Sequence, residues 1–239
     1  MHQAWHRAKL KSKAFCNLPN LRTFMPENFP KYSFGERVAD GAIHIIGVTA
    51  SLSAATILVI FAFHHLPSLS FVSLSIYGVG LVAVFGCSAA YHLINKPRLK
   101  AILRRCDHAA IYLKIAGTYT PFAILKIGGT IGFGLLGVVW IISLFGATAK
   151  LLWPGHFVKT SYVLYLGLGW SGILALDPLA LTISSQVLLL LAAGGGLYTI
   201  GIVFHLWENL RYHNAIWHAF VLAASSCHFA AIAQAASVF

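Results

Sequence analysis

The sequence predicts an all-α membrane protein, a bundle of seven transmembrane helices with a cytoplasmic N-terminus and an external C-terminus. Three observations lead to this prediction. Of the 239 residues, 58% are hydrophobic and only 10% are charged, whereas a soluble domain carries roughly 25% charged residues. Seven apolar segments approach the length of about 20 residues that a helix needs to cross a bilayer. The basic residues gather in alternate connections, which indicates a fixed orientation in a membrane.

The chain divides into a predicted basic cytoplasmic tail, residues 1–35, and a transmembrane domain, residues 36–239. The tail lacks the apolar core of a signal peptide, so we expect no cleavage. In a soluble protein the formal net charge of +11 would suggest nucleic acid as a partner. No stripe of interleaved basic and aromatic residues accompanies it. We therefore expect the partners to be membrane lipids and not nucleic acid.

The predicted spans follow one another through short connections. Each break contains proline, glycine or charged residues, as in "HHLPS", "NKPRLKAILRR" and "WPGHFVK". The fifth span is short and the third contains Pro121. The seven spans cover about 40–63, 71–94, 107–126, 129–152, 160–176, 181–205 and 215–239.

The lysines and arginines set the predicted direction. Fifteen of the 17 lie in the N-terminal tail or in the connections after the second, fourth and sixth spans. Only Lys126 lies in a connection on the other side, and Lys114 lies within the third span. Because basic residues are retained on the cytoplasmic side, the N-terminus is expected there. A charge within a span is costly, so we expect Lys114 to face the bundle interior or a polar cavity.

Polar residues from three distant segments are predicted to meet at the inner leaflet. Imidazole and carboxylate groups are zinc ligands, and a catalytic zinc has three protein ligands and an open position. Each residue alone also has an ordinary explanation, such as an interfacial histidine or a carboxylate at a helix N-terminus. The spacing therefore allows either a metal site or a group of polar residues that simply lie at the membrane interface. The residues are, span by span, Ser88 and His92, then Asp107 and His108, then His213, Asn214 and His218.

Four segments carry a more specific pattern. They are "SAAYH", "RCDHAAIYLKIAGTYTPF", "HNAIWHAFVLAASSCHF", and "FGERVADGAIHIIG" with Glu36. Together they resemble the hemolysin III family, the bacterial branch of the progestin and adipoQ receptor family, over residues 33–239. The resemblance implies a seven-helix bundle with a cytoplasmic N-terminus. It also implies a zinc ion near the cytoplasmic face, held by three histidines, with an aspartate that reaches the metal through a water.

The same resemblance assigns roles by motif. His92 is the second-span ligand, Ser88 is its serine companion, and Asp107 is the aspartate. The family's His-x-x-x-His pair falls on positions 214 and 218. His218 matches the second position, but the first holds Asn214.

The missing histidine stands one place earlier, at His213. Positions 214 and 218 share a helix face, whereas 213 points away on a continuous helix. Asn is a poor zinc ligand but a favoured N-cap, so a helix that begins at Asn214 leaves His213 free to turn inward. We expect His92 and His218 as ligands, with His213 as the third and Asn214 as the alternative.

Two other histidines and one carboxylate fall in the matching stretches. His228 lies ten residues after His218, about 15 Å deeper along a helix, which is too far to share the metal. We expect packing roles for His228 and for His44 in the first span. Glu36 either orients a ligand histidine or pairs with the basic inner surface.

Two functions follow from these residues. In the first, the protein is a zinc-dependent hydrolase of lipid amides, similar to a ceramidase, with Asp107 acting on the water and Ser88 steadying the oxyanion. In the second, zinc is structural, and the protein is a non-enzymatic regulator of membrane homeostasis or is associated with cytolysis. An open coordination position favours the first, and four protein ligands favour the second.

Overall fold

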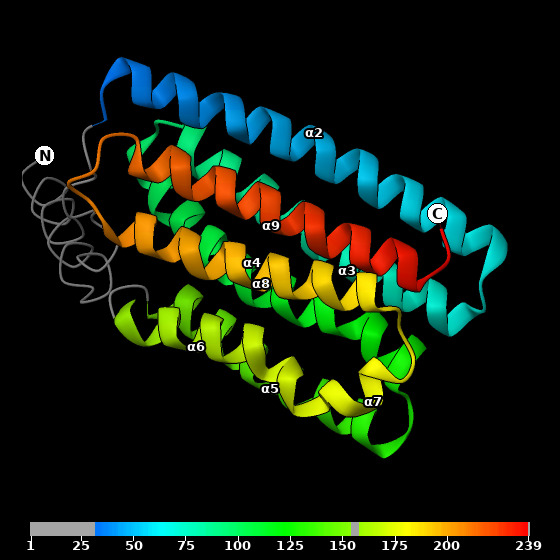
Figure 1. Ribbon diagram of the computed structural model, residues 1–239. Helices are drawn as coiled ribbons and strands as arrows, with labels where there is room; N and C mark the ends of the chain where they lie inside the picture. Colours follow the sequence, from blue (N-terminus) through cyan, green and yellow to red (C-terminus); the bar gives the residue numbers. More distant parts are fainter. Residues whose placement is uncertain (1–31, 154–157, 239) are drawn as a thin grey trace, which may run out of the picture.

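The computed structural model describes residues 32–153 and 158–238, which form helices and contain no strand. Seven long helices run roughly parallel or antiparallel to one axis, and the chain passes back and forth between the two ends of the bundle (Figure 1). The long helices are α2 (Phe34–His65), α3 (Ser68–Leu93), α4 (Pro97–Phe122), α5 (Gly129–Leu152), α6 (Val158–Trp170), α8 (Ser185–Leu206) and α9 (His213–Ala235).

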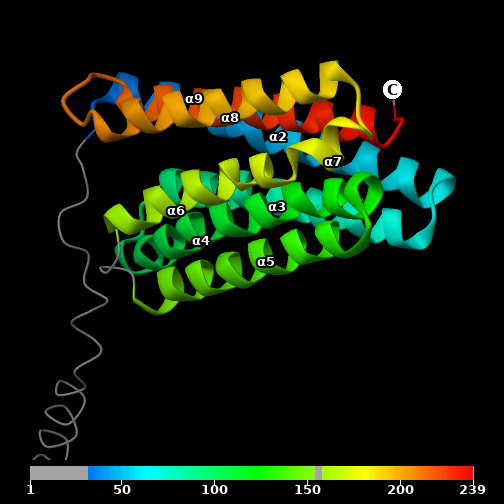
Figure 2. The same cartoon turned by 60° about the horizontal axis from the view of Figure 1, so that its bottom comes forward.

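The protein is an all-α, multi-pass membrane protein. Six helical segments are long and apolar enough to cross a membrane, and large apolar side chains such as Ile141 and Val163 cover their outward faces. Helix α4 is not among the six because it carries several charged residues, yet it packs against both α3 and α5 within the bundle (Figure 2). The six segments are Phe34–His65, Ser68–Leu93, Gly129–Leu152, Thr160–Ala180, Ser185–Leu206 and His213–Ala235.

Two helices begin earlier than the predicted spans. Helix α2 starts at Phe34 because Ser33 caps it: the Ser33 hydroxyl accepts from the Glu36 backbone N–H, and the Glu36 carboxylate accepts from the Ser33 N–H. This capping box satisfies two of the donors that a helix start leaves open. Helix α4 starts at Pro97, where proline fits the first turn because it needs no N–H partner. Asp107 therefore lies inside α4 and not at its beginning.

Two other helices end in irregular turns. Pro121 lies in the last turn of α4, which is followed by a π-helical turn, Ala123–Ile127, and by Gly128 with a positive φ of 61°. Proline removes a helical hydrogen bond, which explains the change of geometry there. The predicted fifth span continues from α6 through a 3₁₀ turn, η3 (Ser171–Ala175), into α7 (Leu176–Ala180). The "DPL" segment, which falls between the predicted spans 160–176 and 181–205, is thus helical, and the connection follows it.

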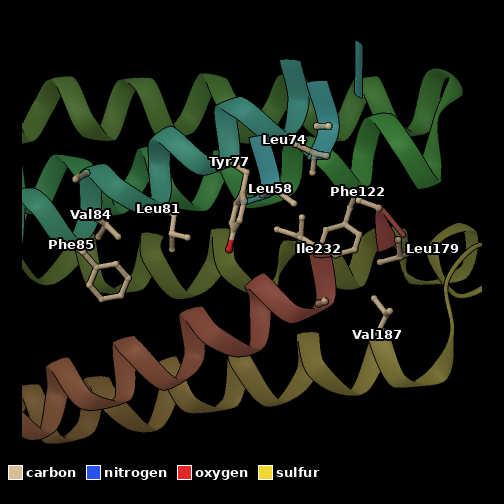
Figure 3. Packing of buried hydrophobic residues seen from close by; sticks show 14 residues of the cluster. Leu58, Leu74, Tyr77, Leu81, Val84, Phe85, Phe122, Leu179, Val187 and Ile232 are labelled. Carbon is tan, nitrogen blue, oxygen red and sulfur yellow. The ribbon is translucent and has the colours of Figure 1, made fainter. Parts of the chain in front are cut away.

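The main apolar core lies between α2, α3, α4 and α9 (Figure 3). Leu58, Leu74 and Tyr77 are completely buried in it, and Ile232 of α9 packs into the same cluster. These residues lie toward the ends of α2 and α9 and the beginning of α3, so they occupy one end of the bundle. The opposite end, where α2 and α9 begin and α3 ends, contains the polar residues.

Candidate metal centre

The beginning of α2 is tied to the beginning of α9. Besides its capping bond, Glu36 accepts a hydrogen bond from the backbone N–H of Tyr212 at 3.1 Å. Tyr212 is the residue before α9 and has a left-handed backbone with φ 64°, a conformation that costs energy for a residue other than glycine. The hydroxyl of its side chain lies 2.8 Å from where a Cβ on Gly35 would be, so a larger residue at position 35 would displace that hydroxyl. The contact fixes where the first turn of α9 lies relative to α2.

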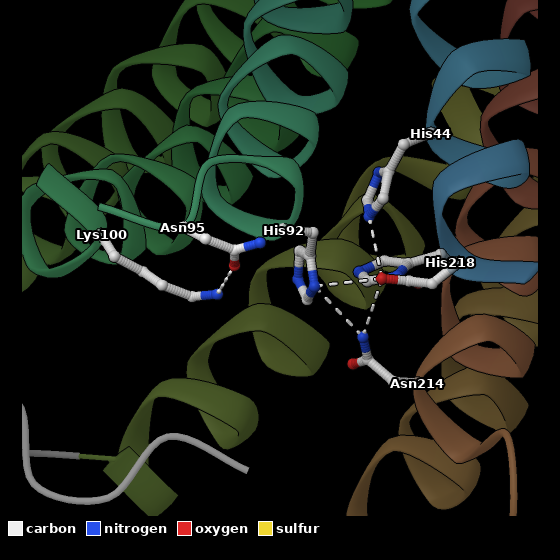
Figure 4. Close-up of polar contacts among 7 residues, drawn as sticks. His44, His92, Asn95, Lys100, Asn214 and His218 are labelled. Atoms are coloured by element: carbon white, nitrogen blue, oxygen red, sulfur yellow. Dashed lines mark hydrogen bonds and ion pairs between the residues drawn. The ribbon is translucent and has the colours of Figure 1, made fainter. Parts of the chain in front are cut away.

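Four buried or half-buried side chains converge one turn deeper. Asp40 and His44 lie four residues apart on α2, and so on one face of it. They meet His92 from the last turn of α3 and His218 from the second turn of α9 (Figure 4). Each of the four offers one ligand atom, and these atoms all lie within 4.8 Å of one another. Three helices that are distant in sequence thus form one group of metal-ligating side chains.

The Asp40 carboxylate is at the centre of this group. Its Oδ1 lies 2.6 Å from His218 Nδ1, and its Oδ2 lies 3.1 Å from His92 Nδ1 and 3.5 Å from His44 Nε2. The rings of His44, His92 and His218 lie 4.4 to 4.9 Å apart, measured between centroids. A buried carboxylate needs charged or hydrogen-bonding partners, and the three imidazoles supply them.

The donor set fits a metal ion. Imidazole nitrogen and carboxylate oxygen are ligands that borderline divalent ions accept. His44 Nε2 is buried and forms no hydrogen bond with any residue in the described part of the chain, and its polar contact given above is the longer 3.5 Å one with Asp40 Oδ2. Buried polar atoms are normally satisfied, so a metal ion that His44, His92 and His218 share would account for this nitrogen.

The residues predicted as ligands are only partly brought together. His92 and His218 lie in the group, as the resemblance implied. Asn214 is adjacent: its Nδ2 lies 3.3 Å from Asp40 Oδ2 and 3.3 Å from His92 Nδ1. The condition under which His213 could turn inward, a helix that begins at Asn214, is not met, because α9 begins at His213 with Tyr212 as its N-cap.

His213 lies outside the group. Its ring centroid is 6.0 Å from that of Tyr32, and its Nδ1 forms no hydrogen bond within residues 32–153 and 158–238. Because His213 is already helical, its side chain points away from the face that carries His218. The structure therefore places Asn214, and not His213, beside the donors Asp40 and His92 of α2 and α3.

Asp107 and Ser88, the predicted catalytic residues, line the same cavity as the four-residue group but do not belong to it. Ser88 is buried on α3, one turn before His92. Asp107 is half-buried on α4, beside His108, whose Nδ1 lies 2.6 Å from the carbonyl oxygen of Arg104.

Sequence reasoning missed Asp40 and assigned His44 a packing role. The available signal was the Asp-x-x-x-His spacing in "ADGAIH", which places a carboxylate and an imidazole on one face of an apolar helix. Glu36, for which two roles were considered, instead accepts backbone N–H groups and so positions the chain before α9.

The group lies in a cavity of about 1570 Å³ that extends along the bundle. Glu36, Asp40 and Asp107 line one end, and Ile127 and Leu179 line the other. The polar end has hydrogen-bonding and metal-ligating side chains, and the far end is apolar. A cavity of this kind suits a ligand with one polar end and a hydrocarbon chain.

Comparison with known proteins gives a consistent result. The family described as "Haemolysin-III related" matches residues 33–229. A "Hemolysin-3 homolog" from Bacillus subtilis is 39% identical over 83% of this chain and 93% of that protein, and a "Hemolysin-3" from Bacillus cereus is 38% identical over 81% and 89%. The human "Monocyte to macrophage differentiation factor" is 30% identical over 66% of this chain and 67% of that protein. No solved structure matches.

Proposed function

The chain belongs to the haemolysin-III-related family of membrane proteins, and on that premise we propose that it is a zinc-dependent hydrolase of lipid amides. The observation that carries this proposal is the position of the donor set. Asp40, His44, His92 and His218 lie at the polar end of a cavity whose opposite end is apolar. A lipid amide has the matching shape, with a polar carbonyl group attached to an acyl chain.

Zinc is the ion that the donor chemistry favours, since protein zinc sites use imidazole and carboxylate ligands. Zinc bound there would polarise the amide carbonyl as a Lewis acid and make a water reactive near neutral pH. His44, His92 and His218 would hold it, and Asp40 would either complete the set or accept hydrogen bonds from the imidazoles and orient them.

The other polar residues of the cavity have separate roles. Asp107, which belongs to α4 and not to the donor group, accepts a proton from the attacking water and passes it to the leaving amine. The Ser88 hydroxyl donates a hydrogen bond to the oxygen that becomes negative in the transition state. The apolar walls toward Leu179 exclude water and hold the acyl chain.

A second function is favoured by one specific observation. Four protein side chains, not three, are within reach of a single ion, and structural zinc sites are closed by four protein ligands. In that case the metal joins α2, α3 and α9, and the protein is a non-enzymatic regulator of membrane homeostasis. An association with cytolysis, which the names of the Bacillus relatives suggest for those proteins, belongs to this alternative.

The orientation is part of the proposal. We take α4 as the seventh crossing, because its neighbours α3 and α5 both span. The N-terminus and the metal centre then lie on the cytoplasmic side, where most lysines and arginines lie. The orientation can be tested with single cysteines in a cysteine-free background and a membrane-impermeant maleimide. A cysteine replacing Lys126 should be labelled from outside the cell, and one replacing Arg211 should be labelled only from inside.

The decisive experiment combines metal analysis with turnover. Purified protein should contain about one zinc per chain and hydrolyse ceramide or a related lipid amide. The His92→Ala variant should lose both metal and activity, whereas Asp107→Ala should keep the metal and lose activity. Zinc retained by a protein that turns over no lipid amide would favour the structural alternative. A folded protein without metal would rule out both.

A further inference from the structure

Lys114 is a buried cation in the middle of the bundle. As its place within a span predicts, it faces the interior: the residue is 4% exposed and lines the cavity. Its backbone lies against α3 at Gly80, where an added Cβ would be 3.3 Å from Lys114 Cα. The side chain therefore points from α4 toward the helices on the other side of the cavity.

The Lys114 ammonium has a hydroxyl partner but no carboxylate partner among the described residues. Its Nζ donates to the Tyr198 hydroxyl at 2.7 Å, and the Tyr198 and Ser225 hydroxyl oxygens lie 2.6 Å apart. Every ion pair formed within the described part of the chain involves Asp40 and a histidine. An ammonium offers three donors, and a buried charge without a counter-charge is costly. The site therefore has positive charge and donor capacity for an anion.

This anion site is separate from the metal centre. Ser225 and His218 both lie on α9, seven residues apart, which corresponds to about 10 Å along the helix. His228, three residues further along, also lines the cavity, and its Nδ1 forms no hydrogen bond with a described residue. Lys114, Tyr198 and Ser225 come from α4, α8 and α9, so the site is built by three helices.

The cavity beyond this site is apolar. Its walls toward the far end include Phe122, Leu179, Leu188 and Leu191. A molecule bound there meets one positive charge, a few hydroxyl or imidazole groups, and then mainly apolar side chains. One ammonium balances one negative charge, which favours a carboxylate over a phosphate dianion.

We propose that Lys114, with Tyr198 and Ser225, binds the head group of a long-chain carboxylate whose hydrocarbon chain lies in the apolar part of the cavity. The ammonium and the carboxylate form a charge-assisted hydrogen bond in a water-poor setting, where such bonds are strong. The Tyr198 hydroxyl holds the ammonium in place from one side. This binding needs neither the metal nor the hydrolysis proposed above.

The test measures binding of palmitate and of hexadecanol, its uncharged analogue of equal chain length, to the full chain in detergent by native mass spectrometry. Wild-type protein should prefer palmitate. The Lys114→Met variant, which removes the charge and shortens the unbranched side chain by one atom, should bind palmitate about 10- to 100-fold more weakly and bind hexadecanol unchanged. Lys114→Arg should retain most of the affinity. Lys126→Met is the matched control, because Lys126 does not line the cavity, and it should behave as wild type.

Chelation separates this site from the metal centre, because palmitate binding should survive metal removal by EDTA. Binding that is lost with the metal and unchanged in Lys114→Met would place the carboxylate on the metal and overturn the proposal. Equal affinity of wild-type protein for palmitate and hexadecanol would overturn it as well. If Lys114→Met fails to fold, the proposal is tested by comparing palmitate and hexadecanol binding in the wild type and in Tyr198→Phe. The Tyr198→Phe variant should bind palmitate several-fold more weakly than the wild type does.

Discussion

Helices α2, α3 and α9 carry two regions of opposite character. At one end, Asp40, His44 and His218 are buried and polar. At the other, Leu58 and Ile232 are buried and apolar, with almost no exposed surface. Asp40 and Leu58 are 18 residues apart on α2, about 27 Å along the helix. Packing at the apolar end holds the helices together. The polar end can therefore contain buried ionisable groups, which lower the stability of the fold unless they have partners.

The two regions also differ in how many contacts hold each side chain in place. The apolar cluster takes side chains from many turns of several helices, and a substitution removes one contact among many. In the polar region each group depends on a named partner, and Asp40 alone contacts three histidines. The following substitutions test this difference, beginning with the one that should have the largest effect.

Asp40→Asn should have the largest effect on the metal. The change keeps the shape of the side chain but removes the charge that three imidazoles contact. Substituting residues that only support ligands costs about 10- to 100-fold in affinity, so loss of this central carboxylate should exceed about 100-fold. Metal content after dialysis against a zinc buffer measures it. Asp177→Asn, on α7, is the control and should retain the metal. Normal metal content in Asp40→Asn would contradict the arrangement.

Leu58→Ala tests the apolar end. Leu58 is completely buried, so the truncation leaves a cavity and should lower the free energy of unfolding by about 3 kcal/mol. Leu52→Ala, on the same helix with 49% of its surface exposed, should change it by less than about 0.5 kcal/mol. Denaturant unfolding in detergent compares the two. Both variants should contain as many metal ions per chain as the wild type. Fewer metal ions per chain in Leu58→Ala would show that the two regions are not independent.

Asn214→Ala should have a moderate effect. It removes the amide that donates to Asp40 beside His92, and metal affinity should fall about tenfold. His213→Ala is the matched neighbour and should leave the affinity unchanged, because the His213 ring lies near Tyr32 and outside the donor group. Zinc titration against a competing chelator distinguishes them. The reverse order of effects would mean that His213 is the third ligand.

Glu36→Gln should have the smallest effect of the four. An amide accepts the backbone hydrogen bonds of Ser33 and Tyr212 less strongly than a carboxylate does. The start of α9 is then held less firmly, and metal affinity should fall only a few-fold. Glu208→Gln, an exposed site, should match the wild type in the same zinc titration. An effect as large as that of Asp40→Asn would assign Glu36 to the metal itself.

Much of the fold could be predicted from the sequence, because the physical cause is local. Apolar runs form the spans, and Pro67, Pro97 and Gly128 separate helices close to where composition placed the breaks. The predicted starts of α2 and α4 were less accurate, because a capping box and an N-terminal proline extend each helix beyond its apolar segment.

The site was harder to predict because it depends on contacts between helices. His92 and His218 were identified from motifs near span ends. Asp40 was missed because it lies among apolar residues, and only the approach of α3 and α9 gives its carboxylate three partners. The choice between His213 and Asn214 depended on where α9 begins, which Tyr212 and Glu36 determine together from distant parts of the sequence.

The bond between Glu36 and Tyr212 has a consequence for how the protein is made. The ribosome releases Glu36 early and Tyr212 late, 176 positions further along the chain, and Asp40 and His218 are 178 positions apart. During most of synthesis, Asp40 therefore lacks its two partners on α9, Asn214 and His218, although His44 on the same helix is already present. The four-residue group can therefore form only after α9 has been synthesised, and a chain that stalls before α9 lacks His218.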